Sequence, residues 1–146
     1  MRARRHVLPA LLLCAAAVTA CMAAERPPTR EEAVRQLDAD AGHLLGDAGL
    51  RLSAPDRRDD HACVPGKVRH SVRAESDLPE VSDGLLRRLR AMGYDRVADD
   101  PDLRDDDQDV AVLRHPRTWV EFELTVRSGD RPGVRVVGRT TCYPTG

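Results

Sequence analysis

The densest group of side chains that could do chemistry is an acidic run at residues 99–109, DDPDLRDDDQD. Its second half, residues 105–109, has the D-x-D-x-D spacing that begins an EF-hand calcium loop. Such a loop also needs glycine at its sixth position and glutamate at its twelfth, where this chain has Val110 and Pro116. We therefore expect a solvated acidic loop before a strand, and a Ca²⁺-dependent adhesion element is the less favoured alternative.

The histidines could supply a general base if a carboxylate oriented one of their rings. Beyond the first twenty residues none of them has the spacing of a zinc site: His43, His61, His70 and His115. No serine lies in a G-x-S-x-G turn, and no glycine-rich phosphate loop occurs, so nothing supports nucleotide binding. An envelope hydrolase would need a pocket in which His70 or His115 meets two carboxylates or a hydroxyl. A binding module would instead have a shallow surface.

The first residues have the pattern of a secretory signal. MRARRH carries three arginines, and residues 7–20 then contain no charged side chain. Fourteen apolar residues are too few to cross a bilayer as a helix, which needs about 20. We expect a leader that is removed from the mature protein.

The end of this leader, VTAC at residues 18–21, resembles the lipobox of bacterial lipoproteins. The resemblance implies that Cys21 receives a diacylglyceryl group and that cleavage precedes it, so that residues 1–20 are removed. Two acyl chains would hold the protein firmly on the outer face of the cytoplasmic membrane. Residues 21–28 would then form a short linker. Ordinary secretion, with cleavage near Ala20, Ala23 or Ala24, is the alternative.

The resemblance to a lipobox also implies a fate for each of the four cysteines. Cys14 would leave with the leader and Cys21 would be lipidated, which leaves Cys63 and Cys142 in an oxidising compartment. We expect these two to form a disulfide that stabilises the fold by about 4 kcal/mol in the chain-entropy model. Free thiols or a metal site are the alternatives, but further ligands at a suitable spacing are missing.

Charge and composition exclude some partners and suggest a source. Three of the 23 basic residues lie in the leader, so 20 basic face 24 acidic residues in the mature chain, a net charge of about −4. Nucleic acid binding needs a basic footprint and is not expected. Lys67 is the only lysine, and this arginine bias is typical of a GC-rich genome. The domain looks like small uncharacterised lipoproteins of high-GC Gram-positive bacteria.

Two helices are expected. Thr29 and Glu32 fit a capping box, and apolar residues at helical spacing follow, which predicts a helix over 30–46. A second helix is expected over 83–92, with Ser82 as its N-cap and Gly93 at its C-terminal stop.

Alternating apolar and polar residues predict the strands. The expected strands are residues 67–73, 94–97, 110–114, 119–126 and 134–142, and residues 53–61 are expected to be a charged loop. Residues 29–146 should therefore form a single α+β domain, with two helices packed on one face of a mostly antiparallel sheet of four or five strands. The other face should be wet.

That wet face holds the remaining candidate residues. The arginines of 67–73 are expected to pair with carboxylates such as Glu121 and Glu123, or to contact anionic lipid headgroups or wall polymers. Trp119 should point outward, where it could anchor a partner or pack on arginine stems. We conclude from the sequence that the chain is a non-enzymatic binding module of the cell envelope without a cofactor. Its partner, an envelope protein or a wall polymer, is not specified by the residues.

Overall fold

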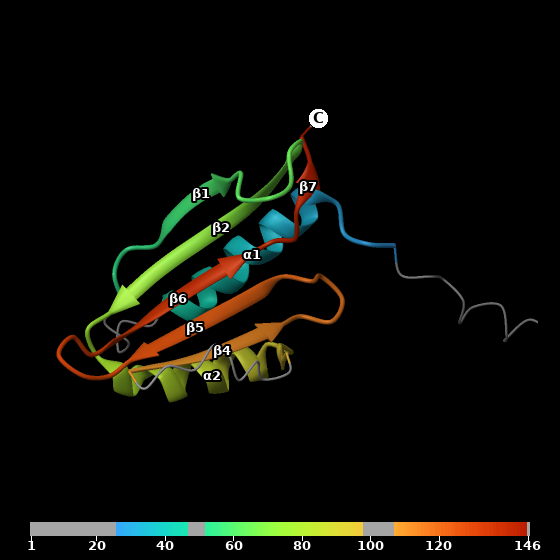
Figure 1. The fold of residues 1–146 in the computed structure, drawn as a ribbon. Coiled ribbons are helices and arrows are strands. Elements are labelled where there is room, and N and C mark those ends of the chain that lie inside the picture. Colours follow the sequence, from blue (N-terminus) through green and yellow to red (C-terminus); the bar gives the residue numbers. More distant parts are fainter. Residues whose placement is uncertain (1–25, 47–51, 98–106, 146) are drawn as a thin grey trace, which may run out of the picture.

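An antiparallel sheet forms one layer of the fold and two helices form the other (Figure 1). The structure, a computed structural model, describes residues 26–46, 52–97 and 107–145. The elements run in the order α1 (Arg30–Leu45), β1 (Asp56–Asp60), β2 (Lys67–Ser76), the 3₁₀ turn η3 (Pro79–Val81), α2 (Ser82–Ala91), β3 (Asp95–Arg96), β4 (Gln108–Arg114), β5 (Glu121–Arg127), β6 (Gly133–Arg139) and β7 (Tyr143–Pro144).

The strand order is β1-β2-β6-β5-β4-β3, and β7 pairs with the start of β2. Every pairing is antiparallel. The α+β class is confirmed, with seven strands in the sheet in place of the expected four or five. The additional strands are β1, at the edge, and the two-residue β7.

Helix α1 begins as its sequence predicts. The Glu32 backbone N–H donates to Thr29 Oγ1 at 3.3 Å, and the Thr29 backbone N–H donates to Glu32 Oε2 at 2.8 Å. These reciprocal bonds satisfy two backbone donors that a helix N-terminus would otherwise leave open. The hydrogen bonds from Thr29 also lower the pKa of Glu32.

Helix α2 covers the expected residues, but Ser82 does not cap it. The 3₁₀ turn that starts at Pro79 runs directly into the helix, so Ser82 already has helical backbone angles, with φ −55° and ψ −44°. An N-cap residue needs an extended backbone to turn its side chain onto the first turn. The predicted cap was therefore wrong, whereas Gly93 has the positive φ, +88°, of a helix stop.

Strand β1 occupies the segment expected to be a charged loop. Its sequence, DRRDD, has no apolar alternation, so no burial pattern marks it as a strand. It pairs with β2 in a register that sets Asp60 against Arg69 and Asp59 against His70. Cross-strand charge pairs therefore replace hydrophobic burial here. The charges also oppose pairing of this exposed edge strand with a strand of another chain.

The inward positions of the strands face the helices and are buried. Val68, Val72, Phe122 and Leu124 have at most 3% of their surface exposed, as the alternation predicts. The core that these strands share with both helices includes the helix residues Leu37, Ala41, Leu44, Leu85 and Leu89. Helix α1 crosses β6 closely at Gly138, where an added Cβ would lie 2.7 Å from Leu37 Cδ1.

A disulfide joins Cys63 to Cys142, with Cα atoms 6.0 Å apart. It connects the segment before β2 to the segment between β6 and β7, and its cysteines are 79 residues apart in sequence. The predicted pairing is confirmed. Closing a loop of this length restricts the unfolded chain and corresponds to about 4 kcal/mol of stability.

In the described parts of the chain, neither helix has the length and apolarity needed to traverse a lipid bilayer.

Candidate functional site

The face of the sheet turned away from the helices carries a group of arginines. They occupy outward positions of β1, β2 and β6, three strands that lie side by side in the sheet. We call them the arginine cluster: Arg58, Arg69, Arg73, Arg135 and Arg139. Together with Asp60, Ser71, Glu123 and Val137 they line a cavity of about 190 Å³. Five guanidinium groups therefore share this cavity with two carboxylates. Two more carboxylates, Asp56 and Glu75, pair with Arg58 and Arg73 from beside it, which leaves an excess of one positive charge.

Four of these arginines lie within ion-pair distance of a carboxylate. Arg58 lies 4.0 Å from Asp56, two residues before it on β1. Arg69 lies 2.8 Å from Asp60, and Arg139 lies 2.9 Å from Glu123. Arg73 pairs with Glu75, two residues further along the same strand, at 2.6 Å.

The partners differ in part from those expected from the sequence. Strand β6 separates β2 from β5, so Glu121 and Glu123 do not pair with the β2 arginines. Glu121 pairs instead with Arg114 across β4 and β5, at 2.8 Å, and Glu123 pairs with Arg139. The expectation that arginines of this face pair with carboxylates is correct, but the identity of the partners depends on the strand order.

Hydrogen bonds keep two carboxylates beside the cluster ionised. The Ala62 backbone N–H, and after it Arg69, lower the pKa of Asp60. The Arg73 guanidinium lowers the pKa of Glu75. The negative charges next to these arginines are therefore already committed to partners.

Arg135 differs from its neighbours in its Nε. This atom is buried, yet no hydrogen-bond acceptor among the described residues reaches it. A buried donor without a partner loses its hydration without compensation, which costs about 1–3 kcal/mol. A guanidinium presents two parallel N–H groups that match the oxygens of a carboxylate or phosphate. The arrangement can therefore bind an anionic group that enters the cavity beside Arg135.

On the opposite side of the sheet, a second group of charges fills the seam between α1 and β1. We call it the seam cluster: Arg30, Asp38, Arg57, Asp59 and His70. Arg30 lies 2.8 Å from Asp59, and Arg57 lies 3.1 Å from Asp38. The His70 hydrogen bond, and after it Arg30, lower the pKa of Asp59. These pairs attach the polar edge strand to the helix.

His70 meets two carboxylates in this seam. Its Nδ1–H donates to Asp59 Oδ1 at 3.1 Å, because an ionised carboxylate can only accept. Its Nε2 lies 3.6 Å from Asp38 Oδ1, too far for a hydrogen bond. The ring is held in one orientation, as a general base would be, but only 14% of the side chain is exposed.

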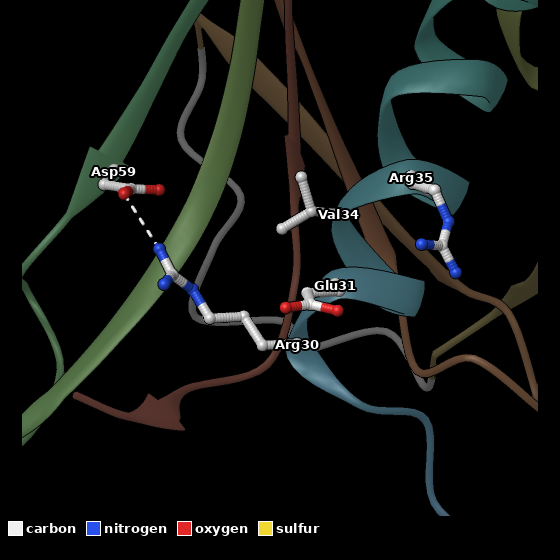
Figure 2. A pocket seen from close by; sticks show the side chains of 5 residues that line it. All are labelled: Arg30, Glu31, Val34, Arg35 and Asp59. Carbon is white, nitrogen blue, oxygen red and sulfur yellow. Dashed lines mark hydrogen bonds and ion pairs between the residues drawn. The ribbon is translucent and has the colours of Figure 1, made fainter. Parts of the chain in front are cut away.

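A cavity of about 450 Å³ opens beside the seam, and Figure 2 shows the side chains around it. Arg30 bridges from α1 to Asp59 on β1, while Glu31, Val34 and Arg35 form the helix wall. His70 does not line this cavity. The two carboxylates that a hydrolase would need are thus present at His70, but its ring is not part of the adjacent cavity.

The other histidines do not assemble such a group. His115 supports the turn between β4 and β5, where its Nδ1 accepts the backbone N–H groups of Arg117 and Thr118 at 3.3 Å. Its ring packs edge-on against Tyr94, with ring centroids 5.3 Å apart. His43 and His61 are exposed on the surface.

Most of the acidic run 99–109 lies outside the described residues. Asp107 and Asp109 lie inside them, at the start of β4, and Asp107 accepts the Ser128 backbone N–H at 3.0 Å through its carbonyl oxygen. Within residues 26–46, 52–97 and 107–145, no three histidine, cysteine, aspartate or glutamate side chains gather closely enough to hold a metal ion. The proposed lipidation residue, Cys21, also lies outside the described residues.

Sequence reasoning overlooked Arg58, Arg135 and Arg139. The alternation that places Val134 and Val136 inward also places Arg135 outward, so this signal was present in the sequence. Arg58 had no such signal because its segment was interpreted as a loop. Trp119 was expected on the outer side and is 49% exposed.

Comparisons with known proteins give a likeness of fold. No family model matches the chain. No curated protein matches it either. The crystal structure of a DUF4853 family protein from Actinomyces odontolyticus is similar, with a TM-score of 0.49 and 15% sequence identity, over 84% of this chain and 72% of that one.

Proposed function

We propose that this chain is a small lipoprotein of the outer face of the cytoplasmic membrane, and that its arginine cluster binds a phosphate-bearing polymer of the cell envelope. The observation that carries the proposal is Arg135, whose buried Nε has no acceptor among the described residues. A phosphodiester oxygen in the cavity would supply that acceptor. The role is one of binding, and no bond is made or broken.

The shape of the cluster favours a polymer over a single small anion. Its arginines are spread over three adjacent strands, and neighbouring strands lie about 4.8 Å apart. The cluster therefore extends roughly 10 Å across the sheet, enough for successive phosphates of an extended chain. The excess of positive charge is local, because the mature chain as a whole is acidic.

Binding can be measured by calorimetry with poly(glycerol phosphate) as the probe. Arg135→Gln removes the guanidinium while keeping an uncharged polar side chain, and we expect it to weaken binding about tenfold, since a hydrogen bond to a charged group is worth about 1.5–3 kcal/mol. Raising the salt concentration should weaken binding of the wild type further.

Arg57→Gln is the matched control, because Arg57 belongs to the seam cluster on the other side of the sheet. It should leave the affinity unchanged. The absence of binding heat with the wild type, or an equal loss in both variants, would overturn the proposed site. Binding of polyglutamate with equal affinity would show that phosphate is not the recognised group.

The anchor is tested separately at Cys21. Cys21→Ala should move the protein from the membrane fraction to the medium, because the acyl chains would be lost. The mass of the N-terminal peptide of the wild type should include the diacylglyceryl group. Retention of the variant in the membrane, together with an unmodified wild-type peptide, would contradict the anchor.

A second candidate function is hydrolysis at His70, favoured by the carboxylates that lie near both of its ring nitrogens. It predicts that the wild type cleaves chromogenic esters or glycosides and that His70→Gln does not. Equal rates of cleavage by the wild type and the variant would exclude His70 as a catalytic residue. Because His70 does not contribute to the arginine cluster, its substitution should leave binding of the polymer unchanged.

A further inference from the structure

Two large apolar side chains stand out on the surface of the described residues. Val64 is 63% exposed and Trp119 is 49% exposed. Lone exposed apolar residues are common on soluble proteins, so the pair is informative only through its position.

Both residues lie at the same end of the sheet. Val64 precedes the first residue of β2, and Trp119 precedes the first residue of β5. In the register, Arg139 of β6 pairs with Glu121 of β5 and with Ser71 of β2. Because β2 and β5 are both antiparallel to β6, they run in the same direction, and the segments before them lie at the same end of the sheet. Figure 1 shows that α1 also starts at this end.

Trp119 is held outward in a backbone conformation that few residues adopt. Its φ is +57°, and it is the only residue other than glycine with a positive φ in the described part of the chain. Its N–H donates to the His115 carbonyl at 2.9 Å, and the His115 N–H donates to the Val120 carbonyl at 2.9 Å. A bulky residue in this conformation costs of order 1–3 kcal/mol, which glycine would avoid. The indole does not recover that cost by becoming buried.

The chain that precedes α1 leads to the proposed anchor. The described chain starts at Arg26, and Cys21 lies five residues before it. Helix α1 starts at Arg30, nine residues after Cys21, and nine residues span at most about 32 Å when fully extended. The end of the domain that contains the start of α1 must therefore stay near the bilayer if Cys21 is lipidated.

We propose that this end of the domain rests on the lipid surface. The Trp119 indole would lie at the level of the headgroups, and the Val64 side chain would make a second contact with the lipids. Tryptophan favours this interfacial layer because its ring is apolar and its N–H is polar. Two exposed cations, Lys67 and Arg117, lie within three residues of these apolar side chains and would attract anionic headgroups. The inference rests on the lipid anchor of the proposed function but not on the arginine cluster.

Trp119 is the single tryptophan of the chain, so its fluorescence reports this position alone. The lipidated protein would be reconstituted into vesicles of phosphatidylcholine and phosphatidylglycerol, with and without bromine on the acyl chains. We expect the brominated lipids to quench roughly half of the emission, since an interfacial indole lies next to the chains.

The control moves the tryptophan to the other end of the same strand. In the double variant Trp119→Phe, Asp130→Trp, the indole lies in the exposed turn after β5, about 23 Å further along the strand direction. Its emission should not be quenched. A lipidated wild type without quenching, or equal quenching at both positions, would overturn the docking while leaving the anchor intact. An N-terminal peptide without acyl chains would overturn both.

Discussion

The helix-facing side and the outer side of the sheet both carry arginines and carboxylates, but their charges are balanced differently. In the seam cluster, Arg30 and Arg57 each lie against an aspartate, and His70 lies between the same two aspartates. In the arginine cluster, the Nε of Arg135 has no such partner among the described residues. Each cluster thus keeps one buried Nε without an acceptor among the described residues, that of Arg30 in the seam and that of Arg135 on the outer face. Arg30 also forms a close ion pair with Asp59, whereas Arg135 faces Glu75 across β2 and β6 and acts on it only through its charge, so the outer face is where an outside anion can bind.

The same contrast holds for packing. Inward residues of β5 and β6 such as Phe122 and Val136 are sealed by two helices, while the outward side chains of these strands, apart from the buried Thr125, are partly exposed. Adjacent residues on one strand therefore experience different surroundings. Substitutions at neighbouring positions can test how far the two faces act independently.

The largest difference is expected between Phe122 and Glu123. Phe122 is completely buried, so Phe122→Ala should lower the free energy of unfolding by about 3–5 kcal/mol. Glu123→Ala breaks one pair with Arg139 on the outer face and should cost less than about 1 kcal/mol. Urea denaturation of the two variants measures both. Similar losses would mean that the outer face contributes to the core.

The next largest difference is expected between Gly138 and Val137. In Gly138→Ala the new methyl group would lie 2.6 Å from Phe122 Cε1, and overpacking of this kind costs about 1–3 kcal/mol. Val137→Ala, on the outer face, should cost less because it leaves no enclosed cavity. Thermal unfolding provides the comparison, and a stable Gly138→Ala protein would show that α1 can move away from β6.

Tyr94 tests the polar part of the inner side. Burial, and after it the hydrogen bond to Asp40 at 2.6 Å, raises the pKa of Tyr94 well above its ordinary value. The folded protein keeps this phenol neutral while the unfolded chain ionises near pH 10. Its contribution to stability is therefore complete below about pH 10 and is lost as the pH rises further.

Tyr94→Phe should cost about 1–2 kcal/mol at neutral pH and should flatten the alkaline decline. Denaturation curves between neutral and strongly alkaline pH measure both effects. An unchanged decline in the variant would assign the alkaline sensitivity to another group.

The smallest effects are expected from Asp59 and Asp60, one on each side of the sheet. Both have a lowered pKa, so each stabilises the fold above about pH 4 and loses this contribution as the pH falls through its folded value. Asp59→Asn and Asp60→Asn should each reduce the acid sensitivity slightly, and added salt should reduce it further because both pairs are partly exposed. An acid profile unaffected by either variant would show that these pairs contribute nothing measurable.

The sequence predicted those parts of the fold in which apolar burial leaves a pattern. The alternation of Val120, Phe122 and Leu124 identified β5, and the capping box at Thr29 identified the start of α1. Strand β1 was missed because ion pairs and not apolar residues attach it to its neighbours. Ser82 was mistaken for a cap because a 3₁₀ turn before a helix leaves no distinct residue pattern.

The candidate site was predictable only in part. That the outer face is polar follows from the alternation, and so does the outward position of Arg135. Which carboxylates pair with these arginines depends on the strand order, because β6 lies between β2 and β5 and separates the β2 arginines from Glu121 and Glu123. Long-range pairings of this kind cannot be deduced from the spacing of residues along the chain.

The disulfide determines what a proteolytic cut would release. Cys63 and Cys142 enclose all of the strands from β2 to β6. A single cut in any turn between these strands would leave two fragments that remain covalently joined. A nicked molecule would migrate as one species until a reductant separates it, and it would keep both fragments attached to whatever holds its N-terminal part.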